Sequence, residues 1–427
     1  MKKQLFALLL IAPMLVFCSP SSNSEPNGEK EEENKNEQEN QEPKPAAPKI
    51  YLFDTTKDTK APAVNDGDDV LATNPNVEKF LSEVTYPDKD WSYTKIYDYY
   101  GGFNEVKYNE NGEPDENGSV VTDPVSDIPP SYSISWTAGD AADTLDFHLA
   151  EGDWEMNIKL KGNCCFYNVS NLVPNTHYTY KVSNTAGTVL AEGGFDTHGH
   201  LRQAFFKKSN NIPESVRNCR DLGGWQTLDG KTVKFHKIYR GGRMQSLENR
   251  CKEEILAEGI GGQLDLRNSD ALASPAIKGM DFCAPKIEEG GTSMLSNMKG
   301  AKVKQCFEFV VKCLREGKGV YFHCSLGRDR TGTFDILLLG LLGVREGDIS
   351  KAYEVSYFAP KGYSIALSED ETKFFSNRTT WVYEPVAKYF WNKAGKTGTF
   401  ADGCETYLLG IGVSQQDIDD YRSIMLK

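Results

Sequence analysis

A ten-residue segment, HCSLGRDRTG (323–332), constrains the fold of this chain more than any other. An apolar, β-prone stretch with the sequence VYF leads into it, and the apolar run TFDILLLGLLG leads out of it. The pattern predicts a buried strand that ends at Cys324, a turn, and a helix that begins near Arg330. Gly327 lies inside the turn and permits the unusual backbone angles that a tight corner needs.

Such a corner is suited to bind a phosphate dianion above a nucleophile. Backbone N–H groups at a helix N-terminus attract anions, and Arg330 adds a planar, permanently charged clamp for two oxygens. The positive surroundings favour the thiolate of Cys324, so we expect attack on phosphorus and a phosphocysteine that water then hydrolyses. The predicted substrate-binding residues in the loop are Ser325, Leu326, Gly327 and Arg328.

The leaving oxygen needs a proton, and two carboxyl groups are candidates to supply it. Asp329 lies inside the loop and is the predicted general acid. Asp221 is an alternative, although in RDLGG it equally fits a turn residue that bonds its own backbone. Thr331 is expected to donate a hydrogen bond to the sulfur, and His323 to orient the loop rather than react.

Cysteine spacing supports this interpretation. The chain has ten cysteines, and only Cys324 has an arginine six residues later. The alternative is a reduced, buried thiol beside an incidental arginine. No CxxC occurs, and no Cys/His cluster has zinc-ligand spacing, so no metal and no cofactor are expected. Disulfides cannot be assigned from the spacing, and several cysteines on apolar faces fit buried thiols.

The segment resembles the HCxxGKDRTG signature of a bacterial branch of protein-tyrosine phosphatases, some of which also cleave phosphoserine, phosphothreonine and phosphoinositides. The resemblance covers about residues 205–427 and includes NCRDLGG (218–224), IYRGG (238–242) and QLDLRN (263–268). It implies an α/β cysteine-phosphatase domain with a central sheet flanked by helices.

The resemblance also implies roles for single residues. Cys324 would be the nucleophile, Arg330 the phosphate clamp and Asp329 the loop-borne acid. Three more residues would line or support the pocket and are predicted to bind substrate: Arg220, Asp265 and Arg267. Arg328 departs from the family's lysine, which leaves the preference for lipid headgroups open.

Three functions remain open on the sequence alone. The first is a protein-tyrosine phosphatase, with broad specificity not excluded, and the second is a phosphoinositide or inositol polyphosphate phosphatase. The third is a non-catalytic phosphate-binding surface lipoprotein, against which the intact catalytic residues argue. The segment 280–300 fits either a flexible cover over the site or a solvated loop. The net charge of −13 argues against a nucleic-acid partner.

The N-terminus reads as a targeting signal over residues 1–18, with two lysines before a short apolar run that ends at Cys18. It resembles a bacterial lipoprotein signal with a lipidated Cys18, although Phe17 stands where a small residue is usual. A plain secretory signal or an uncleaved anchor is the alternative. Residues 19–48 form an acidic, disordered linker. We therefore expect a membrane-anchored protein outside the cytoplasm, on a bacterial cell envelope.

The remaining chain divides into three regions. Residues 50–123 suggest strands and long loops. Residues 124–198 alternate as an all-β sandwich that resembles fibronectin type III, with Trp136 as the core tryptophan and Tyr178 as a corner tyrosine that bonds back to the backbone. Residues 200–427 alternate between strands and helices, as an α/β domain does. His198 and His200 lie between these two domains and fit a linker better than a metal site.

Overall fold

The computed structural model describes residues 50–61, 68–91, 99, 128–209, 212–216, 218–244, 246–359 and 382–427. The predicted signal, Cys18, the acidic linker and most of 92–123 lie outside these residues. Within the described ranges, no helix is both long enough and apolar enough to cross a bilayer.

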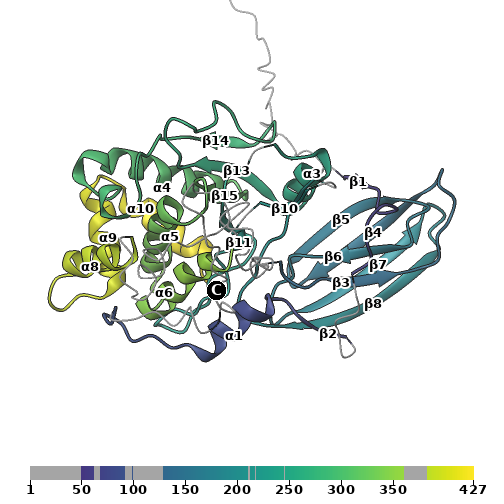
Figure 1. Cartoon of the computed structure of the whole chain (residues 1–427), viewed down its shortest axis with the longest axis horizontal. Helices are drawn as coiled ribbons and strands as arrows, with labels where there is room; N and C mark the ends of the chain where they lie inside the picture. The colour runs from purple at the N-terminus through teal and green to yellow at the C-terminus, as the bar shows by residue number, and fades with distance from the viewer. Residues whose placement is uncertain are drawn as a thin grey trace, which may run out of the picture. The chain divides into compact units, whose positions relative to one another are not determined.

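Two facing sheets form the β domain (Figure 1). Alternating apolar residues from both sheets share one core, which includes Ile134, Phe147, Ile158, Tyr167 and Val182. The antiparallel strands are β3 (Tyr132–Ser135) paired with β6 (Phe166–Val169), and β5 (Trp154–Lys161), β4 (Thr144–Glu151), β7 (His177–Asn184) and β8 (Val189–His198) in that spatial order.

Both aromatic predictions for this domain are confirmed. The Trp136 side chain is buried, and its Nε1–H donates to the carbonyl of Cys164 at 2.8 Å. The Tyr178 hydroxyl accepts a hydrogen bond from the backbone N–H of Val173 at 2.8 Å. The tyrosine thus ties the start of β7 to the loop before it, which is the geometry of a tyrosine corner.

The segment 50–91 belongs to both domains, and the prediction of strands and loops alone is wrong for part of it. β1 (Leu52–Phe53) and β2 (Asp69–Leu71) add parallel pairs to β5 and β8 at opposite edges of the larger sheet. The helix α1 (Pro75–Glu83) follows, with the Asn74 side chain as its N-cap. Its apolar face, with Val77 and Phe80, packs into the core of the α/β domain, so that core begins well before residue 200.

The α/β domain has a five-stranded sheet in the order β11-β12-β15-β13-β14. All neighbouring pairs are parallel except β11 with β12. The strands are β11 (Arg220–Asp221), β12 (Ile238–Gly241), β13 (Ile260–Asp265), β14 (Asp281–Cys283) and β15 (Gly319–His323). A separate hairpin joins β9 (Lys207–Ser209) to β10 (Ile212–Ser215).

Helices cover both faces of this sheet, because side chains alternate along the central strand β15. Val320 and Phe322 join the core on one face, and Tyr321 joins the core on the other face. Helix α3 (Asn249–Ala257) covers the Tyr321 face. The helices on the opposite face are α4 (Gly300–Arg315), α5 (Asp329–Leu341), α6 (Glu346–Glu354), α8 (Tyr383–Ala394), α9 (Phe400–Gly410) and α10 (Gln415–Met425).

Helix α5 is the centre of this layer. From Thr331 to Leu341 every residue is buried, because the helix packs on β12 and β15 and is also covered by α6, α8 and α9. An apolar run without a polar face is what such an enclosed helix needs. The predicted strand, turn and helix around residues 319–341 are therefore confirmed, as are α4 and the Ser414-capped α10.

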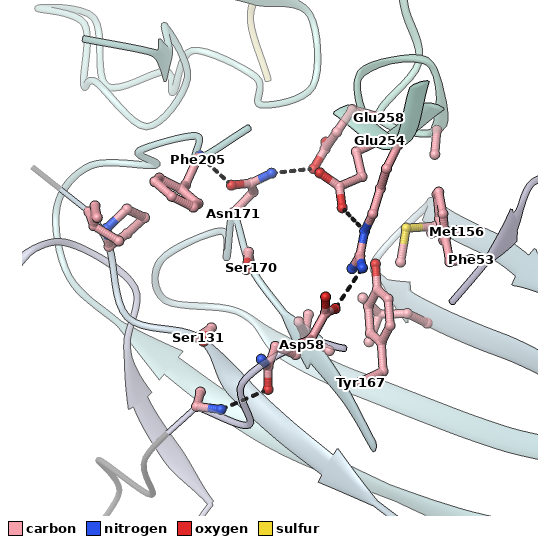
Figure 2. A pocket seen from close by; sticks show the side chains of 18 of the residues that line it. Phe53, Asp58, Ser131, Met156, Tyr167, Ser170, Asn171, Phe205, Glu254 and Glu258 are labelled. Atoms are coloured by element: carbon pink, nitrogen blue, oxygen red, sulfur yellow. Dashed lines mark hydrogen bonds and ion pairs between the residues drawn. The ribbon is translucent and has the colours of Figure 1, made fainter. Parts of the chain in front are cut away.

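A cavity of about 380 Å³ lies where the β domain meets α3 (Figure 2). Its wall carries ion pairs: Arg250 contacts Asp58 at 2.6 Å and Glu254 at 2.9 Å. Asn171 bridges the two domains, since its side chain accepts from the N–H of Phe205 and donates to Glu258. The cavity is lined by residues other than those of the loop 323–332, so it is separate from the predicted site.

Candidate active site

Cys324 follows the last residue of β15, in the middle of the sheet. Parallel strands present their carboxyl ends at one edge, and the register places Gly241 and Asp265 beside His323 there. Cys324 is 4% exposed, so its sulfur lies at the bottom of the site rather than on the surface. The carboxyl edge of the sheet is where an open α/β fold binds its ligands.

The backbone from Ser325 to Arg330 forms the predicted cradle. The N–H groups of these six residues have no hydrogen-bond acceptor in the part of the chain that the structure describes. Asp329 and Arg330 open helix α5, whose first N–H groups have no partner within the helix. The loop therefore presents a row of free donors at the positive end of a helix dipole, which is an anion site.

Gly327 forms the tightest point of this loop. Its φ angle is +75°, a conformation that favours glycine. A Cβ atom here would lie 2.4–2.7 Å from backbone atoms of Gly241 and Gly242. Both conditions exclude a side chain, so the sequence prediction that Gly327 turns the chain is confirmed.

Arg330 points one nitrogen at the wall of the site. Its Nη1 donates to the carbonyl of Ile287 at 3.0 Å, and the rest of its guanidinium has no acceptor among the described residues. Nor does any carboxylate of the described chain pair with it, which leaves a positive charge for an anionic ligand. Fixing one donor in this way orients the planar group for bidentate binding.

The segment 280–300 makes the wall that holds Arg330, so the alternative of a solvated loop is wrong. Ile287, Met294 and Leu295 are fully buried in the core. Gly290 approaches the backbone of Asp329 and Arg330 so closely that no Cβ would fit. The N–H of Gly291 donates to the hydroxyl of Thr333 in α5 at 2.7 Å. The segment is packed against the loop, rather than free to open over it.

The predicted acid and the loop arginine lie together at the rim. Arg328 Nε donates to the carboxylate of Asp329 at 3.2 Å, and both side chains remain partly exposed. The Arg328 guanidinium also lies 5.9 Å from the centre of the Tyr357 ring. Thr331 is fully buried, and its hydroxyl has no partner among the described residues, so the expected bond to sulfur is not formed here.

His323 is fully buried, and its neighbours fix which nitrogen carries the proton. The Gln263 carbonyl oxygen accepts from the N–H of Ala276 at 2.7 Å, so its amide nitrogen donates to His323 Nε2 at 2.9 Å. The proton therefore sits on Nδ1, which donates to the carbonyl of Cys324 at 3.2 Å. Burial lowers the pKa of His323 to about 4, against a smaller opposing effect of Asp265. The predicted orienting role agrees with this geometry.

Three predicted substrate-binding residues lie behind the loop, where they support it. Asp265 and Arg267 form a buried ion pair at 2.8 Å, and Arg267 interacts electrostatically with Cys324. Arg220 donates to the carbonyl of Ala352 at 2.7 Å and to Ser356 Oγ at 3.1 Å. The sequence left two roles open for these residues, lining the pocket or supporting it. All three side chains are almost fully buried, so the structure favours support.

The alternative acid, Asp221, is remote from the rim. Its carboxylate accepts from the N–H of Gly223 at 2.8 Å, as expected of a turn residue, and from Arg202 at 3.1 Å. Burial raises the pKa of Asp221, with Arg202 opposing that effect. The oxygens of Asp221 are thus occupied inside the protein, whereas the Asp329 carboxylate lies in the loop and is partly exposed.

Two residues that the sequence motifs did not single out, Asn218 and Arg240, hold the loop from behind. Asn218 Nδ2 donates to the carbonyls of Leu326 at 3.3 Å and Gly327 at 2.9 Å. Arg240 Nη2 also donates to the Gly327 carbonyl, and its Nη1 pairs with Asp335. Asn218 lies in NCRDLGG and Arg240 lies in IYRGG, two motifs that support the family resemblance. Their place in these motifs was the signal from which a role near the site could have been predicted.

Most of the other cysteines are buried thiols, as expected. The nine described cysteines are thiols rather than disulfides, and Cys165 is the exposed one among them. Burial raises the pKa of Cys283 and Cys313 to about 11, and it also raises the pKa of Cys306 and Cys404 well above the usual value of a thiol. Those four thiols therefore stay protonated at neutral pH and do not compete as nucleophiles.

Comparison with known proteins agrees with this site. Residues 213–427, just over half of the chain, match a family model described as the tyrosine phosphatase family. The chain belongs to the tyrosine phosphatase family. The match begins within β10 and includes the loop, the sheet and every helix from α3 onward.

Individual relatives are distant. A protein of Cupriavidus necator named as a tyrosine-protein phosphatase is 25% identical over 33% of this chain and 60% of its own length. A tyrosine-protein phosphatase of Nostoc commune is 25% identical over 41% of this chain and 69% of its own length. The chain thus spans less than two thirds of the first relative.

Solved structures match this chain at low identity and with low TM-scores. P. aeruginosa TpbA in complex with pTyr has 12% identity and a TM-score of 0.26, covering 42% of this chain and 90% of its own. PTPMT1 has 19% identity and a TM-score of 0.22, covering 33% of this chain and 88% of its own.

Proposed function

We propose that this chain is a cysteine-dependent phosphomonoester hydrolase that acts on phosphotyrosine in proteins. One observation carries the proposal: the end of β15, where Cys324 lies, is surrounded by six consecutive N–H groups without an acceptor and an arginine without a carboxylate partner, both judged among the described residues. Such a site matches a dianionic phosphoryl group and stabilises the charge that develops on it. Membership of the tyrosine phosphatase family supports the same reaction class.

The reaction would proceed in two balanced steps. In the first, the Cys324 thiolate attacks phosphorus, the bond to the phenolic oxygen breaks, and that oxygen takes the proton of Asp329. In the second, the Asp329 carboxylate removes a proton from water, which attacks phosphorus. The sulfur–phosphorus bond breaks, inorganic phosphate leaves and the thiolate is restored. Arg330 and the loop N–H groups hold the phosphoryl oxygens throughout.

The proposal extends to the rest of the chain. Residues 128–198 would be a fibronectin type III-like domain, supported by the strand order and the Tyr178 corner. Cys18 would carry a lipid that anchors the enzyme outside the cytoplasm of a bacterial cell, supported by the apolar signal before it. Detergent partitioning of the expressed protein, compared with a Cys18→Ser variant, tests the anchor. Equal partitioning of the two proteins would contradict it.

Hydrolysis assays test the catalytic proposal. The chain and a Cys324→Ser variant would each be incubated with p-nitrophenyl phosphate, a phosphotyrosyl peptide and inositol phosphates. We expect the unsubstituted chain to hydrolyse the first two, and the variant to lose activity while still binding tungstate. Equal rates for both proteins would refute the cysteine mechanism. Turnover of inositol phosphates without turnover of the peptide would instead identify a phosphoinositide phosphatase.

A further inference from the structure

The peptide planes of the loop explain why its N–H groups face the ligand. A trans peptide is planar, so its carbonyl and its N–H point in opposite directions. The carbonyl of Cys324 accepts from His323 Nδ1 at 3.2 Å, and the carbonyl of Ser325 accepts from the N–H of Arg243 at 3.1 Å. Each bond holds a carbonyl away from the cup, and so directs the next N–H into it.

The two following peptides depend on side chains instead. The carbonyl of Leu326 accepts from Asn218, and the carbonyl of Gly327 accepts from both Asn218 and Arg240. The N–H groups paired with these carbonyls belong to Gly327 and Arg328, and both lack an acceptor among the described residues. The Gly327 carbonyl is therefore the point where two side chains from separate elements converge.

These two anchors are themselves fixed. Asn218 has a φ angle of +53°, and its Oδ1 accepts from Arg220. Arg240 lies on β12, pairs with Asp335 on α5, and donates to Ser356 at 3.2 Å. Arg240 is 1% exposed, so water does not replace these contacts. The anchors thus connect the loop to the strand beside it and to the helix after it.

We propose that Asn218 and Arg240 are positioning residues that turn the Gly327 and Arg328 N–H groups toward the substrate phosphate. This inference rests on the proposed function. Without the anchors, the two peptides would be free to rotate, and a carbonyl dipole facing the phosphate would repel it. Neither side chain touches the ligand. Their effect is to set the loop's donors in place before the phosphate arrives, which lowers the cost of binding.

Tungstate binding, measured by calorimetry, tests the proposal independently of catalysis. Asn218→Asp keeps the shape of the side chain and its tolerance of positive φ, but removes the N–H donor. We expect the Kd for tungstate to rise about tenfold, as the loss of one charge-assisted or buried hydrogen bond predicts, and KM for p-nitrophenyl phosphate to rise with it. Asn175→Asp is the matched control, because Asn175 has a φ of +56° and donates to the Gly199 carbonyl at 2.8 Å.

Arg240 requires two variants, because its removal alone would leave Asp335 unpaired and buried. Arg240→Lys keeps the charge but loses the planar fork, and Arg240→Met with Asp335→Leu removes both charges together. We expect weaker tungstate binding in both, with near-native circular dichroism. The inference would be overturned if folded Asn218→Asp and a folded Arg240 variant both bound tungstate with the Kd of the unsubstituted chain.

The same data separate this inference from the proposed function. A wild-type chain that binds tungstate but hydrolyses none of the phosphate esters would refute the proposed function and leave the anchors supported if their variants bind more weakly. An active wild-type chain whose anchor variants bind tungstate normally would refute the anchors alone. If Asn218→Asp fails to fold, the Arg240 variants decide, because they leave Asn218 unchanged.

Discussion

The buried imidazole of His323 is held in its neutral form, with the proton on Nδ1. Its Nε2 already accepts a hydrogen bond from Gln263, whose amide orientation is fixed by Ala276. A second proton, on Nε2, would face the amide N–H of Gln263 in a buried site, and none of the described residues offers that proton another acceptor. The residue thus works as a neutral donor that fixes the Cys324 carbonyl, and acid should break that bond.

This arrangement predicts how stability responds to pH. The pKa of folded His323 is about 4, below its ordinary value near 6.5, so the unfolded chain takes up the proton first. The contribution of His323 is complete above pH 6.5 and is lost as the pH falls toward 4. Urea unfolding at pH 6.5, 5.5 and 4.5 measures how steeply the unfolding free energy falls as the pH falls. We expect a less steep fall in His323→Gln than in the unsubstituted chain, with a difference in slope that corresponds to at most about one bound proton. Parallel slopes for the two proteins would contradict the prediction.

At the scale of elements, the loop works because a distant segment is packed against it. The wall segment 287–291 supplies a carbonyl to Arg330 and an N–H to Thr333, and its Gly290 packs closely against the backbone of Asp329 and Arg330. The start of α5 is therefore set by three contacts from one short segment. Displacing that segment should move the clamp and the acid together.

Gly290→Ala makes that displacement. The φ angle at Gly290 is −86°, so alanine is tolerated by the backbone, but its Cβ would lie 2.6–2.9 Å from atoms of Asp329 and Arg330. We expect kcat/KM for p-nitrophenyl phosphate to fall by about tenfold to a hundredfold, since small misplacements of catalytic groups are costly. The control is Gly410→Ala at the end of α9, where a Cβ meets nothing within 4 Å. Wild-type kinetics in Gly290→Ala would show that the wall does not position the clamp.

Local patterns predicted the elements that carry the chemistry, because strand β15, the turn and helix α5 are encoded in one continuous stretch. Apolar periodicity also predicted α4 and α10. Helix α1 escaped notice, although Asn74 and Pro75 form a good N-terminal cap. The anchors Asn218 and Arg240 could not be assigned, because the fold, rather than sequence spacing, brings them to Gly327, which lies 109 and 87 residues away from them.

On the scale of the whole chain, the two domains share a buried charged interface. Arg202 donates to the carbonyl of Asn171 in the β domain and to Asp221, Tyr239 and Glu258 in the α/β domain. Nearby, His236 pairs with Glu151 at 2.7 Å and stacks on Trp154 of the β domain. Such contacts make the β domain part of the catalytic unit's support, rather than a spacer.

Removing Arg202 should reveal this support in a pH-dependent manner. Burial by itself would raise the pKa of Glu258. The opposing effects of Arg202 and His236 are larger and lower this pKa to about 2. The stabilising effect is therefore full above about pH 4.5 and is lost as the pH falls toward 2. We expect Arg202→Met to cost about 3–5 kcal/mol of unfolding free energy at pH 7, and clearly less at pH 3.

Urea unfolding measures both values. Arg315→Met is the control, because Arg315 is 39% exposed and pairs with Asp417 and Asp420 on the surface. Its loss should cost at most about 1 kcal/mol. An Arg202→Met cost that is no larger than the control's, or that is equal at pH 7 and pH 3, would show that the interface does not depend on this guanidinium.

The position of α1 has a consequence for how the chain acquires its structure during synthesis. The hydroxyl of Tyr86, just after α1, donates to Glu354 at 2.6 Å, across 268 residues of sequence. β2 likewise pairs with β8, which is the last strand of its sheet to be synthesised. β2 and Tyr86 thus find their partners only after much of the chain has been synthesised, and in a chain interrupted before α6 the Phe80 ring of α1 lacks its neighbour Phe358. High contact order of this kind slows folding and prolongs the time for which apolar surface is exposed to aggregation.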